Sequence, residues 1–383
     1  MAGRVRQPID VKSLETYLQS NVPEISLPLD VKQFGYGQSN PTYLLTSKST
    51  GQGYVLRKKP PGKLLSQTAH KVEREYRIIK ALEFTDVPVP KTYCLCEDSN
   101  VIGTPFYIME FLKGRIFEDA TMPSVSPSER HALWHSAITT LAKFHAVDFR
   151  APSLNLSTFG KSSGFYSRQL LTWKAICDAQ AQATDVDTHK PVGPIHPNID
   201  ALIDFFGDTT LQPQDRASLV HGDFKIDNLM FHPTEPRVIG ILDWEMSTVG
   251  HPLSDVVNLL NPFFMAVQMA SPRNNDLSFP YLPNIDVFLP GRTPGLPTVG
   301  EALAWYVEGG KGKYDPRPDL GWGNAFHAFR SAGILQGIAA RVARRQASSE
   351  FAEKYAGSFK GLGELAWRLA EDEKAKRKTK GKL

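Results

Sequence analysis

Acidic and amide side chains stand at fixed spacing in residues 219–231, between two apolar stretches. Asp223 is followed in this segment by Asn228, and Asp243 comes directly after the next apolar stretch. Phosphoryl transfer needs a base that accepts the proton of the attacking hydroxyl. It also needs oxygen ligands that hold Mg²⁺ against the nucleotide phosphates. Asp223 is predicted to be the base, and Asn228 and Asp243 are predicted to hold the metal.

Two neighbouring residues extend this set. Lys225 lies just after the predicted base and is predicted to neutralise charge on the transferring phosphoryl group. Glu245 follows Asp243 closely and is predicted to contact the metal or to orient Asn228. A turn rich in Asp and Asn, with solvated side chains, is the alternative interpretation. It does not explain why almost wholly apolar strands flank so many carboxylates.

Short strands and a helix precede this segment. Alternating or apolar stretches bounded by turn residues predict strands at residues 32–34, 42–46, 53–58, 91–96 and 105–112. Helical periodicity predicts helices at residues 9–22 and 69–84. The expected result is a five-stranded antiparallel sheet with one helix in its chain path.

The character of the sequence changes after Gly114, where helical periodicity begins to dominate. Two short strands are predicted at residues 218–220 and 237–242, and a proline-rich loop is predicted at 271–300. Further helices are predicted at 298–308, 321–345 and 351–374. The fold class is therefore α+β. It divides into a helical extension (1–28), an N-terminal nucleotide-binding lobe (29–113), a mainly helical lobe with the catalytic and metal sites (114–370) and a basic disordered tail (371–383).

Composition limits the function classes. The 44 basic and 40 acidic residues leave a net charge of +4, and six of the basic residues lie in the last ten positions. The rest of the chain is slightly acidic, so nucleic acid is not an expected partner. The 3 cysteines give no disulfide framework, and no apolar stretch is long enough to cross a membrane. These features predict a cytoplasmic protein of unknown oligomeric state.

The motifs resemble those of the aminoglycoside phosphotransferase-like small-molecule kinases, which share the protein-kinase fold. They are similar in particular to the kinase domain that precedes the dehydrogenase part of acyl-CoA dehydrogenase family members ten and eleven. The match covers residues 34–345, through 34–43, 54–62, 72–76 and the catalytic segment, where Gly222 replaces the Arg of the protein-kinase signature. The resemblance implies a bilobal fold, ATP and Mg²⁺ as cofactors, and a small-molecule hydroxyl as the phosphate acceptor.

The resemblance also implies nucleotide contacts in the N-terminal lobe. Backbone N–H groups of a glycine-containing loop would approach the phosphates; its candidate residues are Gly35, Gly37, Ser39 and Asn40. An ordinary hairpin turn is the alternative for this loop. Backbone groups of the hinge between the lobes, from Glu110 to Leu112, would bind the adenine.

Arg57 occupies the position where kinases carry a phosphate-binding Lys. Arg presents a planar fork of donors there instead of a point charge. Lys58 and Lys59 are the alternatives, although Lys58 is expected on the opposite face of its strand. The predicted ion-pair partner is Glu75, with Glu73 as the alternative.

Further along the chain, Asp255 resembles the family's structural acid that bonds the backbone of the catalytic loop. Arg330 and Arg341 are candidates for holding an anionic acceptor, and solvated helix-surface cations are the alternative. The acceptor itself stays open between a hydroxy acid or hydroxyacyl-CoA and an amino sugar or choline-like alcohol. A catalytically silent nucleotide-binding scaffold is the rival interpretation.

Two smaller patterns carry weaker expectations. His131 and His135 have the spacing of a metal-binding pair on a helix, but no third ligand is evident in the sequence. The last three residues, Gly-Lys-Leu, differ by one residue from a peroxisomal address. Peroxisomal targeting is therefore the alternative to a cytoplasmic location.

Overall fold

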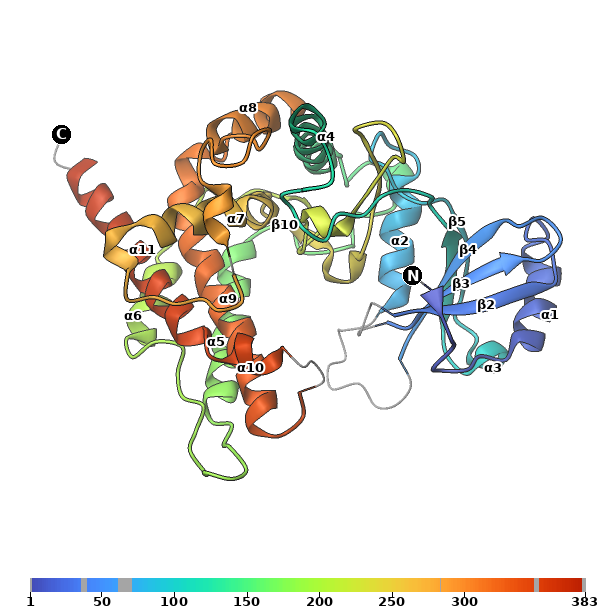
Figure 1. The fold of residues 1–383 in the computed structure, drawn as a ribbon, viewed down its shortest axis with the longest axis horizontal. Helices are drawn as coiled ribbons and strands as arrows, with labels where there is room; N and C mark the ends of the chain where they lie inside the picture. Colours follow the sequence, from blue (N-terminus) through green and yellow to red (C-terminus); the bar gives the residue numbers. More distant parts are fainter. Residues whose placement is uncertain (1, 36–39, 61–70, 283, 348–350, 381–383) are drawn as a thin grey trace. The chain divides into compact units, whose positions relative to one another are not determined.

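The computed structural model describes residues 2–35, 40–60, 71–282, 284–347 and 351–380, and the chain forms two compact units (Figure 1). Unit 1 comprises Met1–Glu118, Val147–Thr158 and Ile226–Ser247. Unit 2 comprises Asp119–Ala146, Phe159–Lys225 and Thr248–Leu383. Two segments from the later part of the chain therefore belong with the N-terminal residues, including the one that carries Asn228 and Asp243.

The sheet of unit 1 has six antiparallel strands, where the sequence analysis predicted five. Their spatial order is β1 (Ala2–Gly3), β2 (Leu29–Phe34), β3 (Thr42–Ser47), β4 (Gly53–Lys58), β6 (Phe106–Glu110) and β5 (Thr92–Cys96). The additional strand, β1, pairs with the end of β2, where Ala2 lies opposite Phe34. Two residues are too few to show an alternating pattern, so this strand could not be predicted from the sequence.

Two helices of unit 1 lie against opposite faces of this sheet. Helix α1 (Val11–Asn21) buries Leu14 and Leu18 in one apolar cluster with Tyr43 and Leu56. The other face carries Arg57 of β4, and its side chain contacts α2 (Val72–Leu82). A short helix, α3 (Ser99–Ile102), lies between β5 and β6 in sequence. Leu56 and Arg57 are adjacent in β4 and therefore point to opposite faces of the sheet.

A second, two-stranded sheet of unit 1 comes from the catalytic segment. Strand β8 (Leu229–Phe231) pairs antiparallel with β9 (Val238–Ile241), so that Leu229 lies opposite Ile241. The predicted strand at 237–242 is confirmed as β9, whereas β8 was not predicted. Gly114 is required here, because a Cβ at this position would collide with the backbone oxygen of Phe231.

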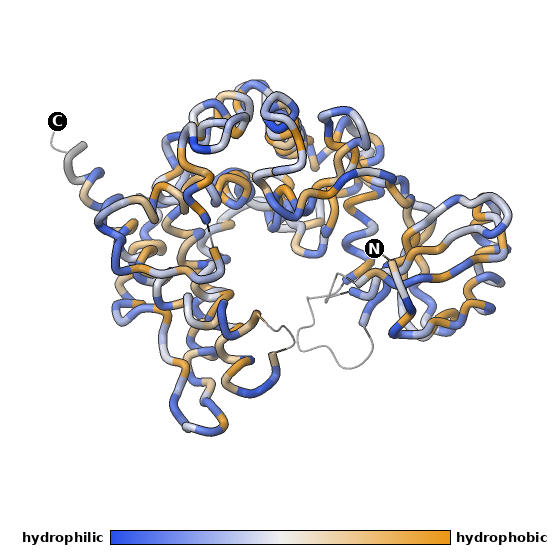
Figure 2. The backbone as a smooth tube through the Cα atoms, viewed as in Figure 1, coloured by the Kyte–Doolittle hydropathy of each residue, from blue (hydrophilic) through white to orange (hydrophobic). Residues whose placement is uncertain are grey.

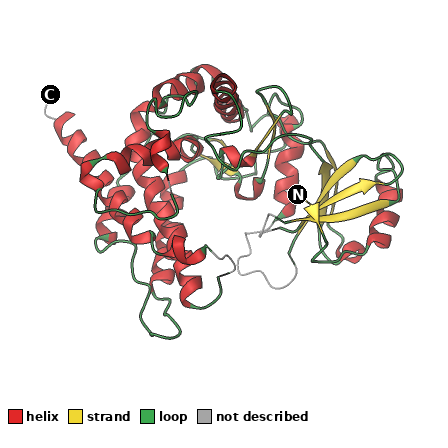
Figure 3. Cartoon of the chain, in the orientation of Figure 1, coloured by secondary structure: helices red, strands yellow, loops and turns green. Residues whose placement is uncertain are grey.

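Helices dominate unit 2, as the sequence predicted (Figure 3). They are α4 (Pro127–Ala146), α5 (Phe165–Ala181), α6 (Ile199–Gly207), α7 (Leu253–Ala270), α8 (Val299–Gly309), α9 (Leu320–Ala343), α10 (Ala352–Ala356) and α11 (Phe359–Lys380). Two strands, β7 (Ser218–Val220) and β10 (Thr248–Gly250), pair antiparallel. The core gathers aromatic side chains of α9, such as Trp322 and Phe329, with apolar residues of α5, α6, α7 and α11.

The C-terminal region differs from its prediction. One helix was predicted at 351–374, but the structure has two, α10 and α11. The tail predicted to be disordered from residue 371 is helical to Lys380, and Figure 2 shows mostly hydrophilic residues in α11 just before its grey end. Arg377 helps to explain this helix, because its guanidinium donates to the backbone oxygens of Thr210 and Leu211. The Gly-Lys-Leu ending lies outside the described residues.

A buried histidine of unit 2 predicts sensitivity to acid. His251 is fully buried, and its Nδ1 accepts from the Leu253 N–H at 3.2 Å while its Nε2 donates to the Gln214 oxygen at 3.1 Å. Burial lowers the pKa of His251 from 6.5 to about 4. The unfolded chain therefore takes up a proton first as the pH falls, and stability is lost between pH 6.5 and about 4. We expect a loss of about 3 kcal/mol from this group.

Urea denaturation of the wild type and of His251→Asn at pH 7.5, 5.5 and 4.5 measures this effect. Asn retains an oxygen that can accept from Leu253 but does not titrate. The variant should lose less stability on acidification than the wild type. Equal losses in the two proteins would contradict the role of His251.

Candidate active site

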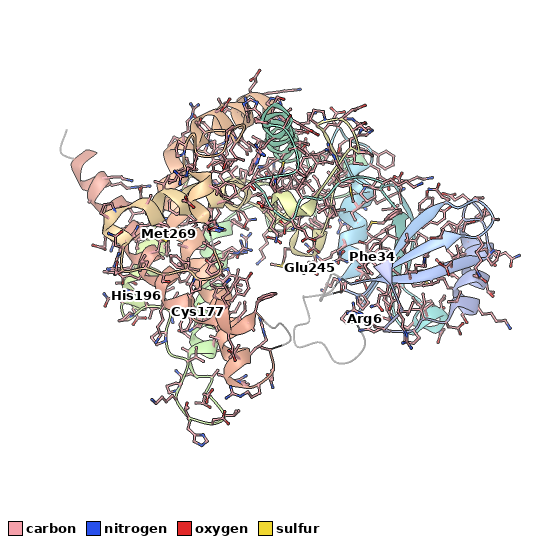
Figure 4. All side chains as sticks on the ribbon, in the orientation of Figure 1. Arg6, Phe34, Cys177, His196, Glu245 and Met269 are labelled. Carbon is pink, nitrogen blue, oxygen red and sulfur yellow. The ribbon has the colours of Figure 1, made fainter. Side chains whose placement is uncertain are left out.

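Arg57 binds three carboxylates within unit 1. Its Nε lies 3.1 Å from Glu75 Oε2, and its Nη2 donates to Asp243 Oδ1 at 2.9 Å. The same Nη2 lies 3.4 Å from Oε2 of Glu245, whose position is labelled in Figure 4. The planar fork of Arg thus contacts acids from α2 and from the turn after β9 together, which a Lys ammonium could do only from a single point.

The alternatives for this ion pair are resolved by the facing of the side chains. Lys59 pairs with Glu73, and neither takes part in the contacts between Arg57 and Glu75. Lys58 lies on the opposite face of β4, with its Nζ 5.8 Å from the centre of the Tyr43 ring. The structure therefore brings Arg57 and Glu75 together, as predicted.

Glu75 is buried among several donors. Only 1% of its surface is exposed, and it accepts from the Asn40 amide at 2.6 Å and from the Tyr107 hydroxyl at 3.1 Å. Burial raises the pKa of Glu75 to about 7, although Arg57 and Tyr107 favour its charged form. Tyr107 was not assigned a role from sequence. The pairing of strands β4 and β6 could have identified it, since Tyr107 of β6 lies directly opposite Arg57 of β4.

The side chain of Asn40 is fully buried and donates to Glu75. Its amide therefore positions Glu75, and the contact of its backbone N–H with a nucleotide stays a prediction. Gly35 lies at the end of the described part of this loop, where its oxygen accepts from Arg6 at 3.4 Å. Gly37 and Ser39 lie outside the described residues.

The hairpin of β8 and β9 brings two predicted metal ligands to the same end. The Leu242 N–H donates to the backbone oxygen of Asn228 at 2.9 Å. Asn228, just before β8, and Asp243, just after Leu242, therefore lie at the same end of the hairpin. Asp243 has a left-handed backbone, with φ of 63°. Such a conformation costs about 1–3 kcal/mol and is found preferentially at functional sites. The Asp243 side chain is 40% exposed and accessible to a ligand.

These residues fit a magnesium ion in their chemistry. An amide and a carboxylate supply the hard oxygen donors that Mg²⁺ takes, usually one or two from protein beside water and phosphate oxygens. Three carboxylates contact the single guanidinium of Arg57, so oxygen atoms of three acids gather around it. Asn228 and Asp243 would hold the ion. Glu245 contacts the same guanidinium nitrogen of Arg57 as Asp243 does. Within the described residues, no group of three or more His, Cys, Asp and Glu side chains forms a metal cluster.

The predicted hinge is partly occupied by the sheet itself. The Glu110 N–H donates to the Lys91 oxygen at 2.7 Å, so this donor is already used. Strand β6 ends at Glu110, and Leu112 packs closely on Gly240 of β9. Phe111 stacks on Phe34, with ring centres 6.4 Å apart. An aromatic pair thus joins the end of β2 to the hinge, and sequence reasoning did not identify it.

In unit 2, one buried acid holds the backbone of the catalytic loop. Asp255 Oδ2 accepts from the His221 N–H at 2.7 Å, and Oδ1 accepts from the Gly222 N–H at 2.9 Å. This confirms the role predicted for Asp255. Burial would raise the pKa of Asp255, but hydrogen bonds and charge interactions with His145 and His221 lower it overall. Asp255 therefore stays charged at neutral pH.

A relay of side chains supports this acid. His145 Nε2 lies 3.2 Å from Asp255 Oδ2, and its Nδ1 lies 2.7 Å from the Tyr306 hydroxyl. Asn258 donates to the Phe224 oxygen at 3.0 Å and fixes the loop further along. None of these three residues was predicted, because they come from α4, α8 and α7 and share no local motif with the loop.

The predicted base is accessible to a substrate. The Asp223 side chain is 37% exposed, and its Oδ2 lies 3.6 Å from the Nζ of Lys225, which is 43% exposed. His221 acts as a scaffold for this loop, since its Nδ1 accepts from the Asp223 N–H at 3.2 Å. Arg330, one of the candidate acceptor ligands, donates to the Gly222 oxygen at 3.0 Å.

The histidine pair of α4 has a partner that the sequence did not reveal. His131 Nε2 lies 2.9 Å from Glu301 of α8, and both His131 and His135 pack edge-on against Trp305. Glu301 also completes the N-terminal capping box of α8 with Thr298. These contacts fasten α4 to α8 and give the pair a structural role.

The α+β fold and these two sets of residues define a protein of the kinase-like phosphotransferase class. The phosphotransferase enzyme family matches residues 30–275. A Ralstonia eutropha JMP134 protein, provisionally assigned as an aminoglycoside phosphotransferase, is 36% identical. Its crystal structure covers 95% of this chain and 99% of its own chain with a TM-score of 0.75. The chain therefore belongs to the phosphotransferase enzyme family.

Two further proteins are similar to this chain, one in sequence and one in fold. Acyl-CoA dehydrogenase family member 11 from Gallus gallus is 39% identical over 96% of this chain but only 44% of its own length. The resemblance predicted from sequence is thus confirmed, and this chain spans less than half the length of these curated relatives, acyl-CoA dehydrogenase family members 10 and 11. ADP-bound aminoglycoside phosphotransferase APH(2'')-Ib shares the fold, with 16% identity, a TM-score of 0.54, and coverage of 93% of this chain and 99% of its own.

None of the helices in the described ranges combines the length and the apolar character needed to span a bilayer.

Proposed function

We propose that this chain catalyses the Mg²⁺-dependent transfer of the ATP γ-phosphate to a hydroxyl group of a small molecule. The observation that carries the proposal is the binding of one guanidinium, Arg57, to both Glu75 and Asp243. A kinase needs a cation fixed by an acid of the following helix and set beside the metal-binding Asp. Membership of the phosphotransferase family supports the same reaction.

In the proposed reaction, each of these residues has its own role. Arg57 contacts the nucleotide phosphates, and Asn228 and Asp243 would hold the metal, which would neutralise charge on the phosphates when bound. The carboxylate of Asp223 accepts the proton of the acceptor hydroxyl. The hydroxyl oxygen forms a bond to the γ-phosphorus while the bond from that phosphorus to the ADP oxygen breaks. Lys225 offsets charge on the transferring group.

The acceptor is proposed to be a hydroxy acid or a hydroxyacyl-CoA. This assignment rests on the similarity to a relative named for an acyl-CoA dehydrogenase, over the part of that protein that this chain spans. Amino sugars and choline-like alcohols are the alternative acceptors within the same reaction type.

Incubation with ATP, Mg²⁺ and pooled metabolite extracts, followed by mass spectrometry, tests the proposal. We expect one or more hydroxyl compounds to gain a phosphate with the wild type. Asp223→Asn should lower that rate by about 10²–10⁴-fold, because it removes the base but preserves the shape of the side chain. The exposed Glu235→Gln, from the turn between β8 and β9, is the matched control and should retain activity.

Two outcomes would contradict the proposal in different ways. ATP binding in calorimetry without transfer to any compound would favour the catalytically silent scaffold. Transfer that is unchanged in Asp223→Asn would show that another group is the base.

A further inference from the structure

A distant arginine reaches the backbone of the catalytic loop in unit 2. Arg330 lies on α9, and its Nη2 donates to the Gly222 oxygen at 3.0 Å, across a separation of 108 residues. That oxygen belongs to the peptide group that joins Gly222 to Asp223. A hydrogen bond from a charged donor contributes about 1.5–3 kcal/mol, more than a bond between neutral groups.

The same peptide group is held at its other side. The Asp223 N–H donates to His221 Nδ1 at 3.2 Å, so the oxygen and the N–H of one peptide plane are both bound. Gly222 has φ of 86°, a left-handed conformation that only glycine adopts without penalty. Since glycine itself restricts the backbone little, the direction of this plane depends on its partners.

The charge of Arg330 also acts on the site. Burial lowers the pKa of Arg330, while attraction to Asp223 and Asp255 opposes that change. The guanidinium stays protonated and lies in the field of both carboxylates. Together with the bonds from Asp255 to the two preceding N–H groups, it completes a set of anchors on either side of Gly222.

We propose that Arg330 is a positioning residue of the phosphotransfer site, which fixes the peptide plane before Asp223 and so sets the direction of the catalytic carboxylate. The inference rests on the function proposed above. In protein kinases the motif itself carries an arginine before the Asp. Here Gly222 stands at that position, and α9 provides a guanidinium from elsewhere in the chain. Arg330 thus acts on Asp223 instead of binding the acceptor.

Steady-state kinetics of three variants test this role. Arg330→Met keeps most of the volume of the side chain but removes the donor, and kcat should fall by about 100-fold, as for a small misplacement of a catalytic group. The KM values for ATP and for the acceptor should change by less than about threefold, because the lost contact is made to the backbone and not to a substrate. Arg330→Lys should recover part of kcat. The exposed Arg344→Met, at the end of the same helix, is the control and should behave as the wild type.

The kinetic outcomes separate the two roles of Arg330. A raised KM for the acceptor with nearly unchanged kcat would overturn the proposal and assign Arg330 to acceptor binding. Unchanged kcat and KM in Arg330→Met would overturn it as well. Melting temperatures of all variants identify any loss that comes from unfolding.

Hydrogen–deuterium exchange provides a readout that does not need activity. Amides in a peptide covering residues 218–226 should exchange at least about tenfold faster in Arg330→Met than in the wild type or Arg344→Met, because the loop loses an anchor. Peptides from β10 should remain unchanged. If the wild type transfers no phosphate, the proposed function fails while the exchange result still decides whether Arg330 fixes the loop. Equal exchange in all three proteins would overturn the positioning role.

Discussion

Replacing Arg57 by Met is expected to reduce phosphotransfer by more than 100-fold and to destabilise the fold by about 3 kcal/mol at pH 8. The variant removes the cation that contacts Glu75, Asp243 and Glu245. Glu75 is almost completely buried, and removing one partner of a buried ion pair typically costs about 3–5 kcal/mol. The Asn40 and Tyr107 hydrogen bonds remain, so we expect the lower end of that range.

The pH dependence of this loss identifies Glu75 as its cause. The pKa of Glu75 is raised to about 7 in the folded protein, above its ordinary value of 4.5, because the side chain is buried. Without Arg57, Glu75 can avoid an unpaired charge by taking up a proton, which becomes easier as the pH falls. The difference between Arg57→Met and the wild type should therefore be smaller at pH 6 than at pH 8. Urea denaturation at the two pH values measures it.

Two control variants make this prediction specific. Lys59→Met removes the neighbouring, more exposed ion pair with Glu73 and should cost no more than about 1 kcal/mol. Arg57→Lys should retain stability better than activity, since a single ammonium can pair with Glu75 but cannot also span to Asp243. A fully active Arg57→Lys would show that the planar fork is not needed.

Replacing Asp255 by Asn is expected to cost about 3 kcal/mol and most of the activity. An amide can accept through one oxygen only, so its NH₂ group would face either the His221 N–H or the Gly222 N–H. A buried donor left without an acceptor is penalised, and His145 loses its charged partner as well. The displaced loop carries Asp223, so kcat should fall with the stability.

Chemical denaturation and kcat measurements on Asp255→Asn check both parts. Asp215→Asn is a suitable comparison, because Asp215 also accepts from a backbone N–H, that of Gly164, but at an exposed position. It should cost less than about 1 kcal/mol and leave kcat unchanged. A stable Asp255→Asn with full activity would show that the loop holds its shape without this acid.

The sequence revealed those parts of the candidate site that are close together in the chain. Asp223, Asn228 and Asp243 were identified because they stand at fixed spacing in the sequence. The structure supports part of this grouping, since Asn228 and Asp243 lie at the same end of the β8–β9 ladder. Their roles in catalysis remain predictions. Glu75 was preferred to Glu73 from its position in the sequence, and the structure shows that Glu75 is the acid paired with Arg57.

Contacts from distant elements could not be predicted. His145, Tyr306 and Arg330 come from three helices, and each looks like an ordinary helical residue in the sequence. Strands β1, β8 and β10 have only two or three residues each, too short for a periodic pattern to distinguish them from loop. Longer elements were located closely: the helical pattern of α9 extends over several turns, and turn residues bound the apolar stretch of β4.

The left-handed backbone of Asp243 narrows the paths by which this position can evolve. Most residues would be strained at φ of 63°, whereas Gly and Asn tolerate it at least as well as Asp. Both are also one nucleotide away from an Asp codon. A descendant that abandoned phosphotransfer could therefore lose the charged ligand here with little penalty to its fold. Among distant members of the lineage, Asn or Gly at this position would be the earliest expected mark of a silenced enzyme.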